Sequence, residues 1–124
     1  MPQDALAGFY TMADVCLQTS MGEGFGVPTI EAQACGTRVI VSDFAASAEL
    51  VGPGWKVGGQ PEWDPMQKSW FFTPNIGEIV GALNAAYEAP RGECAEAIAF
   101  AGEYAADKVY REAWRPLLEE LAAA

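Results

Sequence analysis

The stretch Glu23-Gly-Phe-Gly-Val-Pro-Thr-Ile-Glu31 decides how this chain folds, because its glycine-rich turn leads directly into a helix. Gly24 and Gly26 allow positive φ angles and a close approach of a ligand to the main chain. Pro28 suits the first position of a helix, where its missing N–H costs nothing. The free N–H groups of that first turn, together with the helix dipole, favour an anion beside them. The stretch therefore predicts an anion-binding turn flanked by two carboxylates.

Carboxylates and free amides at one turn indicate a ligand that carries both hydroxyl groups and phosphate. A carboxylate accepts hydrogen bonds from hydroxyl groups. The amides at the start of a helix hold a phosphate. A nucleotide-sugar combines both kinds of group, and we expect it to be the ligand.

The segments on either side of this turn predict an α/β fold. Residues 15–17 form a short apolar run that suits a buried parallel strand, and residues 38–41, rich in β-branched residues, predict the next strand. The helix between them is expected from Pro28 to about Cys35, with Gly36 as a left-handed cap. A further helix, expected from Gln3 to about Met12, precedes the first strand. Together these elements predict a partial Rossmann-like parallel sheet with flanking helices.

The second half of the chain is expected to begin irregularly and to end in helices. A short helix is predicted over residues 46–51, and two short strands, 55–57 and 70–72, flank a loop over residues 58–65. A hairpin that buries its tryptophans agrees with this segment at least as well as a functional loop. Apolar residues at helical spacing predict helices over residues 75–88, 93–104 and 107–121.

Several aromatic residues in this half are most simply interpreted as core residues. They are Trp63, Tyr87, Tyr104 and Trp114. Because loops rich in aromatic residues are often functional, Trp63 and Asp64 could instead contact an acceptor or a partner.

Composition restricts the classes of function. The chain has 124 residues, of which 51% are hydrophobic, and this is typical of one globular domain. Its net charge of −10 repels nucleic acid and anionic lipid head groups. No apolar stretch is long enough to cross a bilayer, so we expect no direct membrane insertion.

Cysteine and histidine content points to a cytoplasmic protein without a metal or cofactor. The first residues lack the basic and apolar regions of a signal peptide. Three widely spaced cysteines fit reduced thiols better than a disulfide framework. The chain has no histidine, so a transition-metal site is not expected and the commonest general base is missing.

Motifs around the loop resemble those of a known enzyme family. Tyr10-Thr-Met-Ala-Asp14-Val-Cys-Leu-Gln-Thr-Ser20 precedes the loop, Glu31-Ala-Gln-Ala-Cys-Gly36-Thr-Arg-Val-Ile-Val-Ser42 continues from it, and Glu49-Leu-Val-Gly52 follows. From about Tyr10 to Gly52 the sequence resembles the C-terminal, donor-binding domain of retaining glycosyltransferases of the GT-B fold, family GT4. The resemblance implies a half-domain that binds a UDP- or GDP-sugar whose hexose is transferred to an acceptor hydroxyl.

The resemblance also implies a role for each residue of the loop. Glu23 would be the catalytic carboxylate, contacting the hydroxyls of the transferred sugar and offsetting positive charge at its anomeric carbon. Glu31 would accept hydrogen bonds from the two ribose hydroxyls. Main-chain amides of Gly24, Phe25 and Gly26 would contact the sugar and the distal phosphate. The helix start at Val27, Pro28 and Thr29 would face the pyrophosphate.

The sequence departs from the family in lacking a strand with the Arg and Lys that neutralise the diphosphate. We therefore expect a donor domain truncated at its N-terminal side and inactive as an isolated chain. Other interpretations stay open: a non-catalytic nucleotide-sugar-binding module, or an oligomerising one in which a partner chain or a second copy covers the exposed sheet edge. A GT-B enzyme of another reaction, such as an epimerase, is disfavoured because such enzymes rely on histidine.

Overall fold

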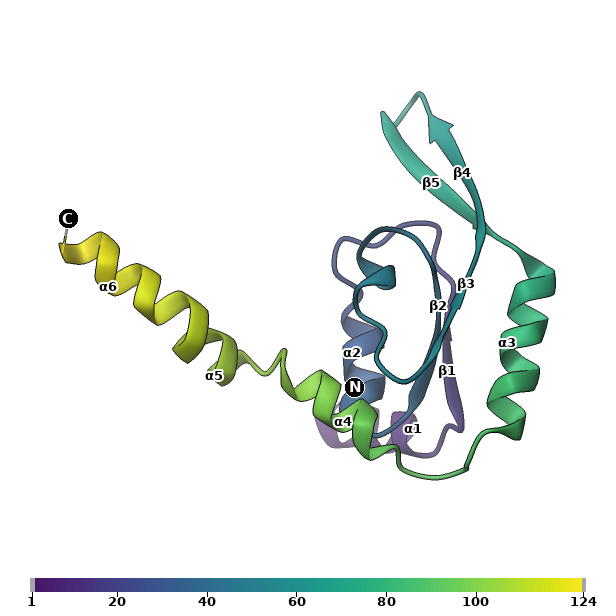
Figure 1. The fold of residues 1–124 in the computed structure, drawn as a ribbon, viewed down its shortest axis with the longest axis horizontal. Coiled ribbons are helices and arrows are strands. Elements are labelled where there is room, and N and C mark those ends of the chain that lie inside the picture. Colours follow the sequence, from purple (N-terminus) through teal and green to yellow (C-terminus); the bar gives the residue numbers. More distant parts are fainter. Residues whose placement is uncertain (1, 124) are drawn as a thin grey trace.

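The strand β2 (Arg38–Ser42) forms the centre of the fold. Its residues Val39, Ile40 and Val41 are each 0% exposed, so the strand is covered on both faces. It pairs in parallel with β1 (Val15–Gln18) on one side and β3 (Trp55–Val57) on the other, giving the order β1-β2-β3. Helices lie on both sides of this sheet in the computed structural model, which describes residues 2–123 (Figure 1). The predicted α/β class with a parallel Rossmann-like sheet is confirmed.

The remaining elements follow the order that the sequence predicts, except that strand β4 is added and that the last predicted helix is divided into three segments. They are α1 (Gln3–Thr11), α2 (Val27–Ala34), the 3-10 turn η1 (Ala45–Ala48), β4 (Gly59–Asp64), β5 (Ser69–Pro74), α3 (Ile76–Glu88), α4 (Ala95–Gly102), α5 (Ala106–Val109), the π-helical turn η2 (Tyr110–Trp114) and α6 (Arg115–Ala123). Helix α3 begins after Asn75, whose side chain accepts a hydrogen bond from the Glu78 amide, as expected of an N-cap.

Two hydrophobic clusters hold the helices on the sheet. Ala32 of α2 packs with Val39 and Val41 on one face of β2. On the other face, Ile40 and Val57 pack with Ala82 of α3. Because alternate residues of a strand point to opposite faces, β2 contributes to both clusters.

The buried side chain of Gln33 fixes helix α2 relative to the segment that follows η1. Its amide nitrogen donates to the carbonyl oxygens of Thr29, at 2.9 Å, and of Leu50, at 2.8 Å. Its Oε1 accepts from the Gly52 amide at 2.8 Å. Gln33 is 0% exposed, and these bonds satisfy its polar atoms where water cannot. The buried amide therefore acts as a brace between two segments far apart in sequence.

Gly36 follows the C-terminal end of helix α2 as a left-handed cap, as predicted. Its φ of 78° is left-handed, and a Cβ there would lie 2.6 Å from Cγ of Glu93. Both the conformation and the space require glycine. The close approach brings the start of α4 against the end of α2, where the Cys94 amide donates to the Gly36 carbonyl.

The predicted loop over residues 58–65 is wrong, because residues 59–64 form β4 and pair antiparallel with β5. The sequence does not indicate this strand, because Gly58, Gly59 and Pro61 belong to residue types that are disfavoured in strand interiors. A two-stranded hairpin tolerates them because each strand has a free edge. The hairpin projects beyond the sheet at the end where β3 leads into it (Figure 1).

The interpretation of the aromatic residues as core is also wrong for three of the four. Trp63 is 51% exposed, Tyr87 72% and Trp114 56%. Trp63 lies on the projecting hairpin, and Trp114 lies in the C-terminal helices, which extend away from the sheet (Figure 1). Periodicity identified the helices correctly, but it could not show that nothing packs against these faces.

No helix within residues 2–123 is both long enough and apolar enough to span a bilayer.

We predict that Gln33→Ala lowers the free energy of unfolding by about 2–4 kcal/mol, because it leaves the Leu50 carbonyl and the Gly52 amide buried without partners. Urea denaturation measures the effect. The exposed Gln67 offers a matched control, and Gln67→Ala should leave stability unchanged. Equal stability of the two variants would contradict the bracing role.

Candidate functional site

The glycine-rich turn leaves the start of α2 free to meet a ligand. Gly26 is the N-cap of α2 in the left-handed conformation, with φ 89° and ψ 52°. A Cβ on Gly24 would meet nothing within 4 Å, so the main chain is open there. Phe25 and Val27 are 46% and 53% exposed. Gly24, Phe25 and Val27 are therefore exposed at the start of the helix, whereas Gly26 itself is buried.

Glu23 is oriented by two side chains from the end of β1. Its Oε1 accepts a hydrogen bond from the Ser20 hydroxyl at 2.9 Å and another from the Gln18 amide at 3.1 Å. The Gln18 amide also lies 3.1 Å from the Ser20 hydroxyl, so the three groups form one network. Glu23 is half-buried, and its other carboxylate oxygen is free to accept from a hydroxyl. The Ser20 hydroxyl therefore helps to orient the Glu23 carboxylate.

The hydroxyl of Thr29 is the one buried side-chain oxygen or nitrogen without a hydrogen-bond partner among residues 2–123. Thr29 is 0% exposed. Its Oγ1 lies 3.6 Å from the position that a Cβ on Gly26 would occupy, and Cγ of Glu23 lies 4.0 Å from the same point. An orphaned hydroxyl costs free energy. Cδ1 of Leu50 lies 3.8 Å from the same point, so the hydroxyl is enclosed between α2 and the segment that follows η1.

Glu31 lies in a separate environment formed by α1 and α2. The Tyr10 hydroxyl donates to its Oε2 at 3.2 Å, which leaves Oε1 free. Burial, together with Glu31 as hydrogen-bond acceptor and as nearby negative charge, raises the pKa of Tyr10 above its ordinary value. Both residues line a hollow of about 230 Å³ with Leu6, Ala7, Ala34 and Cys35.

The structure brings together only some of the residues that the sequence predicts for the site. Glu23, Gly26 and Thr29 meet around one point, whereas Glu31 faces α1. Sequence reasoning missed Gln18 and gave no role to Tyr10, although both stand in the quoted motif. Their partners are 5 and 21 residues away, and no spacing rule for strand–turn–helix contacts would have found them.

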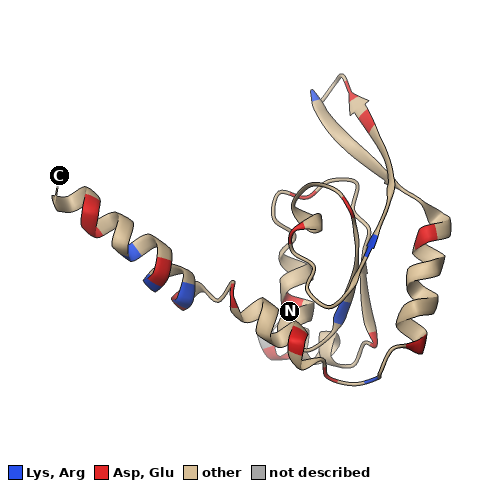
Figure 2. Cartoon of the chain, viewed as in Figure 1, with Lys and Arg blue, Asp and Glu red and all other residues tan. Residues whose placement is uncertain are grey.

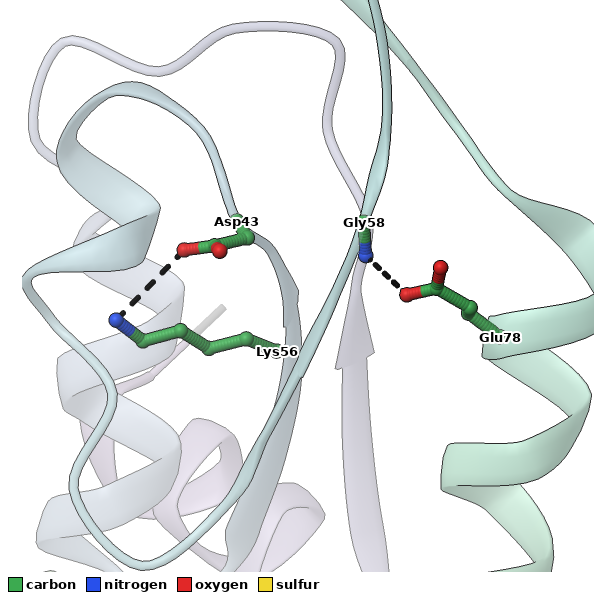
Figure 3. Close-up of polar contacts among 4 residues, drawn as sticks. All are labelled: Asp43, Lys56, Gly58 and Glu78. Atoms are coloured by element: carbon green, nitrogen blue, oxygen red, sulfur yellow. Dashed lines mark hydrogen bonds and ion pairs between the residues drawn. The ribbon is translucent and has the colours of Figure 1, made fainter.

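Cations lie away from this turn. The first Lys or Arg in the sequence is Arg38, and Figure 2 shows neither type on α1, β1, the loop or α2. Arg38 donates to the Pro90 carbonyl at 2.8 Å, as expected of a residue at the far end of its strand. Lys56 pairs with Asp43 across 3.7 Å (Figure 3). The turn can therefore bind an anion only through amides, hydroxyls and the helix dipole.

The remaining side chains of interest lie outside the glycine-rich turn. Asp43 and Glu49 are exposed. Cys35 is half-buried as the C-cap of α2. Cys16 and Cys94 are also free thiols, and burial raises the pKa of Cys16.

A parallel sheet with an open, glycine-rich turn after its first strand defines a Rossmann-like ligand-binding unit, in which ligands bind at the carboxyl end of the strands. Residues 1–101 match the family described as "Glycosyl transferases group 1". The chain belongs to this glycosyltransferase family, and the predicted resemblance is confirmed.

Curated proteins similar to this chain are glycosyltransferases. A D-inositol 3-phosphate glycosyltransferase of Streptosporangium roseum is 31% identical over 109 residues, covering 84% of this chain and 25% of that protein. One of Streptomyces bingchenggensis is 51% identical over 52 residues, covering 42% of this chain and 11% of that protein. An MMP alpha-(1->4)-mannosyltransferase of Mycolicibacterium hassiacum is 38% identical over 53 residues, covering 43% and 13%.

The chain spans a small part of the length of these relatives, a quarter of the first and about an eighth of the others. No solved structure matches the chain significantly.

We predict that Glu31→Gln lowers the pKa of Tyr10, because it removes the carboxylate that opposes ionisation of the phenol. The pKa of Tyr10 is higher in the folded state than in the unfolded state, where it is about 10. The contribution of Tyr10 to stability is therefore fully present below pH about 10 and is lost as the pH rises through the folded-state pKa. Ultraviolet titration of the tyrosines measures the shift. Tyr10→Phe identifies the Tyr10 transition, and an identical titration of Glu31→Gln and the wild type would contradict the contact.

Proposed function

We propose that this chain is the nucleotide-sugar-binding part of a retaining glycosyltransferase, and that its 124 residues form one truncated donor-binding domain. The observation that carries the proposal is the glycine-rich turn after β1, where Gly26 starts α2 in a left-handed conformation and Ser20 and Gln18 hold the Glu23 carboxylate. These groups suit phosphate oxygens and sugar hydroxyls on the same ligand.

Glu23 is proposed to contact the transferred sugar as the catalytic carboxylate. The network from Gln18 and Ser20 occupies one of its oxygens and holds its orientation, which favours a preorganised group over a mobile one. Its other oxygen is available to sugar hydroxyls, and its negative charge would offset positive charge that develops at the anomeric carbon. Main-chain amides of Gly24, Phe25 and Gly26 complete the contact with the sugar and the distal phosphate.

Glu31 is proposed to hold the ribose of a UDP- or GDP-sugar. Tyr10 fixes one carboxylate oxygen and leaves the other free, and the hollow beside it is lined mostly by small or apolar side chains. Val27, Pro28 and Thr29 lie on the helix between the two carboxylates, where the pyrophosphate would pass. This arrangement gives the nucleotide and the sugar separate carboxylates.

A partner chain or a second copy is proposed to cover the open edge of β1. Leu17 on this strand is 45% exposed, and α3 beside it exposes a stripe of apolar residues at helical spacing: Ile76, Val80, Leu83 and Tyr87. Arg38, Tyr87 and Arg91 line a hollow of about 240 Å³ between α3 and this edge. An open strand edge beside an apolar stripe favours an added strand. A cytoplasmic location, in which the thiols stay reduced, completes the proposal.

A second candidate is a non-catalytic module that binds the nucleotide-sugar and docks on its partner. The absence of Lys and Arg from α1, β1, the loop and α2 favours it, because the amides alone must then offset the diphosphate charge. Turnover by an assembly of the chain and its partner would distinguish an enzyme from this module.

We predict that Glu31→Ala weakens binding of a UDP- or GDP-sugar by about 10- to 100-fold, the range for losing hydrogen bonds to a charged acceptor. Calorimetry on the assembled protein measures the affinity. Glu88→Ala, at the exposed end of α3, removes the same charge away from the turn and should change little. Unchanged affinity in Glu31→Ala would remove the ribose assignment.

We also predict that the isolated chain shows no transferase activity, since the cations that neutralise the leaving diphosphate are not present at the turn. The assay is release of UDP or GDP from the corresponding sugar nucleotide with and without acceptor. Turnover by pure protein of this length would overturn the prediction.

A further inference from the structure

The β4–β5 hairpin exposes more aromatic surface than its own folding explains. Trp63 and Trp70 lie opposite each other in the ladder, with ring centroids 5.4 Å apart in an edge-to-face arrangement. Both stay more than half exposed, and Met66 at the turn is 91% exposed. Exposed aromatic groups that lie close together mark interaction sites more often than isolated ones.

A hollow of about 480 Å³ lies against this hairpin. It is lined by Met21, Glu62, Trp63, Asp64, Pro65 and Phe71. Glu62, Asp64 and Phe71 share one face of the hairpin, because alternate residues point to opposite sides, and Trp63 between the two carboxylates also lines the hollow. Trp70 packs on the Trp63 ring and so restricts its orientation.

The two carboxylates of the hollow retain unused hydrogen-bonding capacity. Asp64 Oδ1 accepts from the amides of Met66 and Gln67 in the hairpin turn. Glu62 Oε2 accepts from the Thr73 hydroxyl at 3.1 Å. One oxygen of each carboxylate is therefore free to accept from a ligand's hydroxyl groups.

A sugar ring matches both the apolar side chains and the carboxylates of this lining. Its C–H faces pack on aromatic and apolar side chains, and its hydroxyl groups donate to carboxylates. The lining contains two negative charges and no Lys or Arg, so an anionic ligand would be repelled. The chemistry therefore selects a neutral saccharide over a sugar phosphate.

The hairpin is held firmly next to the glycine-rich turn. The Phe72 amide donates to the Met21 carbonyl at 2.8 Å, two residues before Glu23. The Phe72 ring stacks on Phe44 with centroids 5.0 Å apart.

The base of the hairpin is closed by a second set of contacts. The Gly58 amide donates to Glu78 at 2.6 Å (Figure 3), and the Asn75 amide donates to the Gly58 carbonyl at 2.8 Å. These contacts fix the start and the end of the hairpin against α3. A saccharide in the hollow would thus lie on a rigid support beside the proposed donor loop.

We propose that this hollow binds a neutral sugar ring of the acceptor. The acceptor role rests on the proposed function, whereas the binding of a neutral saccharide does not. The hairpin then contributes acceptor specificity from within the same chain that holds the donor.

Titration of the full chain with methyl α-D-mannopyranoside tests the proposal, with mannose 6-phosphate as the anionic counterpart. We expect saturable shifts of the Trp63 indole N–H resonance with the neutral glycoside and no shift at Trp114. Binding should weaken about tenfold in Glu62→Gln, which keeps the shape but removes the charge. It should also weaken in Trp63→Ala, whereas Trp114→Ala, also an exposed tryptophan, should bind normally.

Three results would overturn the proposal. The first is no shift at Trp63, and the second is that Trp63→Ala and Glu62→Gln bind the glycoside as tightly as the wild type does. The third is that mannose 6-phosphate binds more tightly than the neutral glycoside. Titration of UDP and GDP into the same samples distinguishes failure of the saccharide site on the hairpin from failure of the proposed nucleotide-sugar-binding function. Nucleotide binding without glycoside binding would refute the hairpin site alone. Glycoside binding at Trp63 without nucleotide binding would refute the proposed function and leave the hollow as a saccharide site.

Discussion

The buried amide of Gln33 is the interaction on which the arrangement of the candidate site depends. It joins the first turn of α2 to the segment around Leu50 and Gly52, with every polar atom of the amide used. Because α2 carries the glycine-rich turn at its start and Glu31 along its length, its position sets both halves of the site. The buried strand β2 supplies the apolar support, and Gln33 supplies the fixed orientation. Stability and ligand geometry are linked through one helix.

Orientation of the two carboxylates follows from that arrangement. Glu23 receives hydrogen bonds from the end of β1, and Glu31 receives one from α1. Each keeps an oxygen free, so the helix between them presents two separate acceptors with amides in between. A chain of net charge −10 would not attract a diphosphate by its overall field. In the proposed function, amide dipoles at the helix start would therefore provide the attraction, and the conformation of Gly26 would matter more than the count of charges.

Most of the sheet and its helices could be predicted from sequence, because local rules determine them. The apolar runs, Pro28 near the helix start and Gly36 after its end each have a direct structural meaning, and the family motif covers the same region. A hairpin is one of the two interpretations of this segment, but strand β4 itself could not be predicted, since Pro61 and the glycines argue against a strand and only pairing with β5 overrides them. The exposure of Trp63 and Trp114 also escaped prediction, because periodicity shows which face is apolar but not whether anything covers it. Gln18 and Tyr10 depend on tertiary contacts that spacing alone does not encode.

The central claim is that the turn around Gly26 binds a nucleotide-sugar through its main chain. Amide chemical shifts of the isotope-labelled chain, recorded during addition of UDP-glucose and GDP-mannose, test it most directly. The account predicts saturable shifts that are largest for Gly24, Phe25 and Gly26 and that extend into the first turn of α2. Shifts confined to the hollow near Arg38 and Arg91, with the turn unmoved, would contradict it.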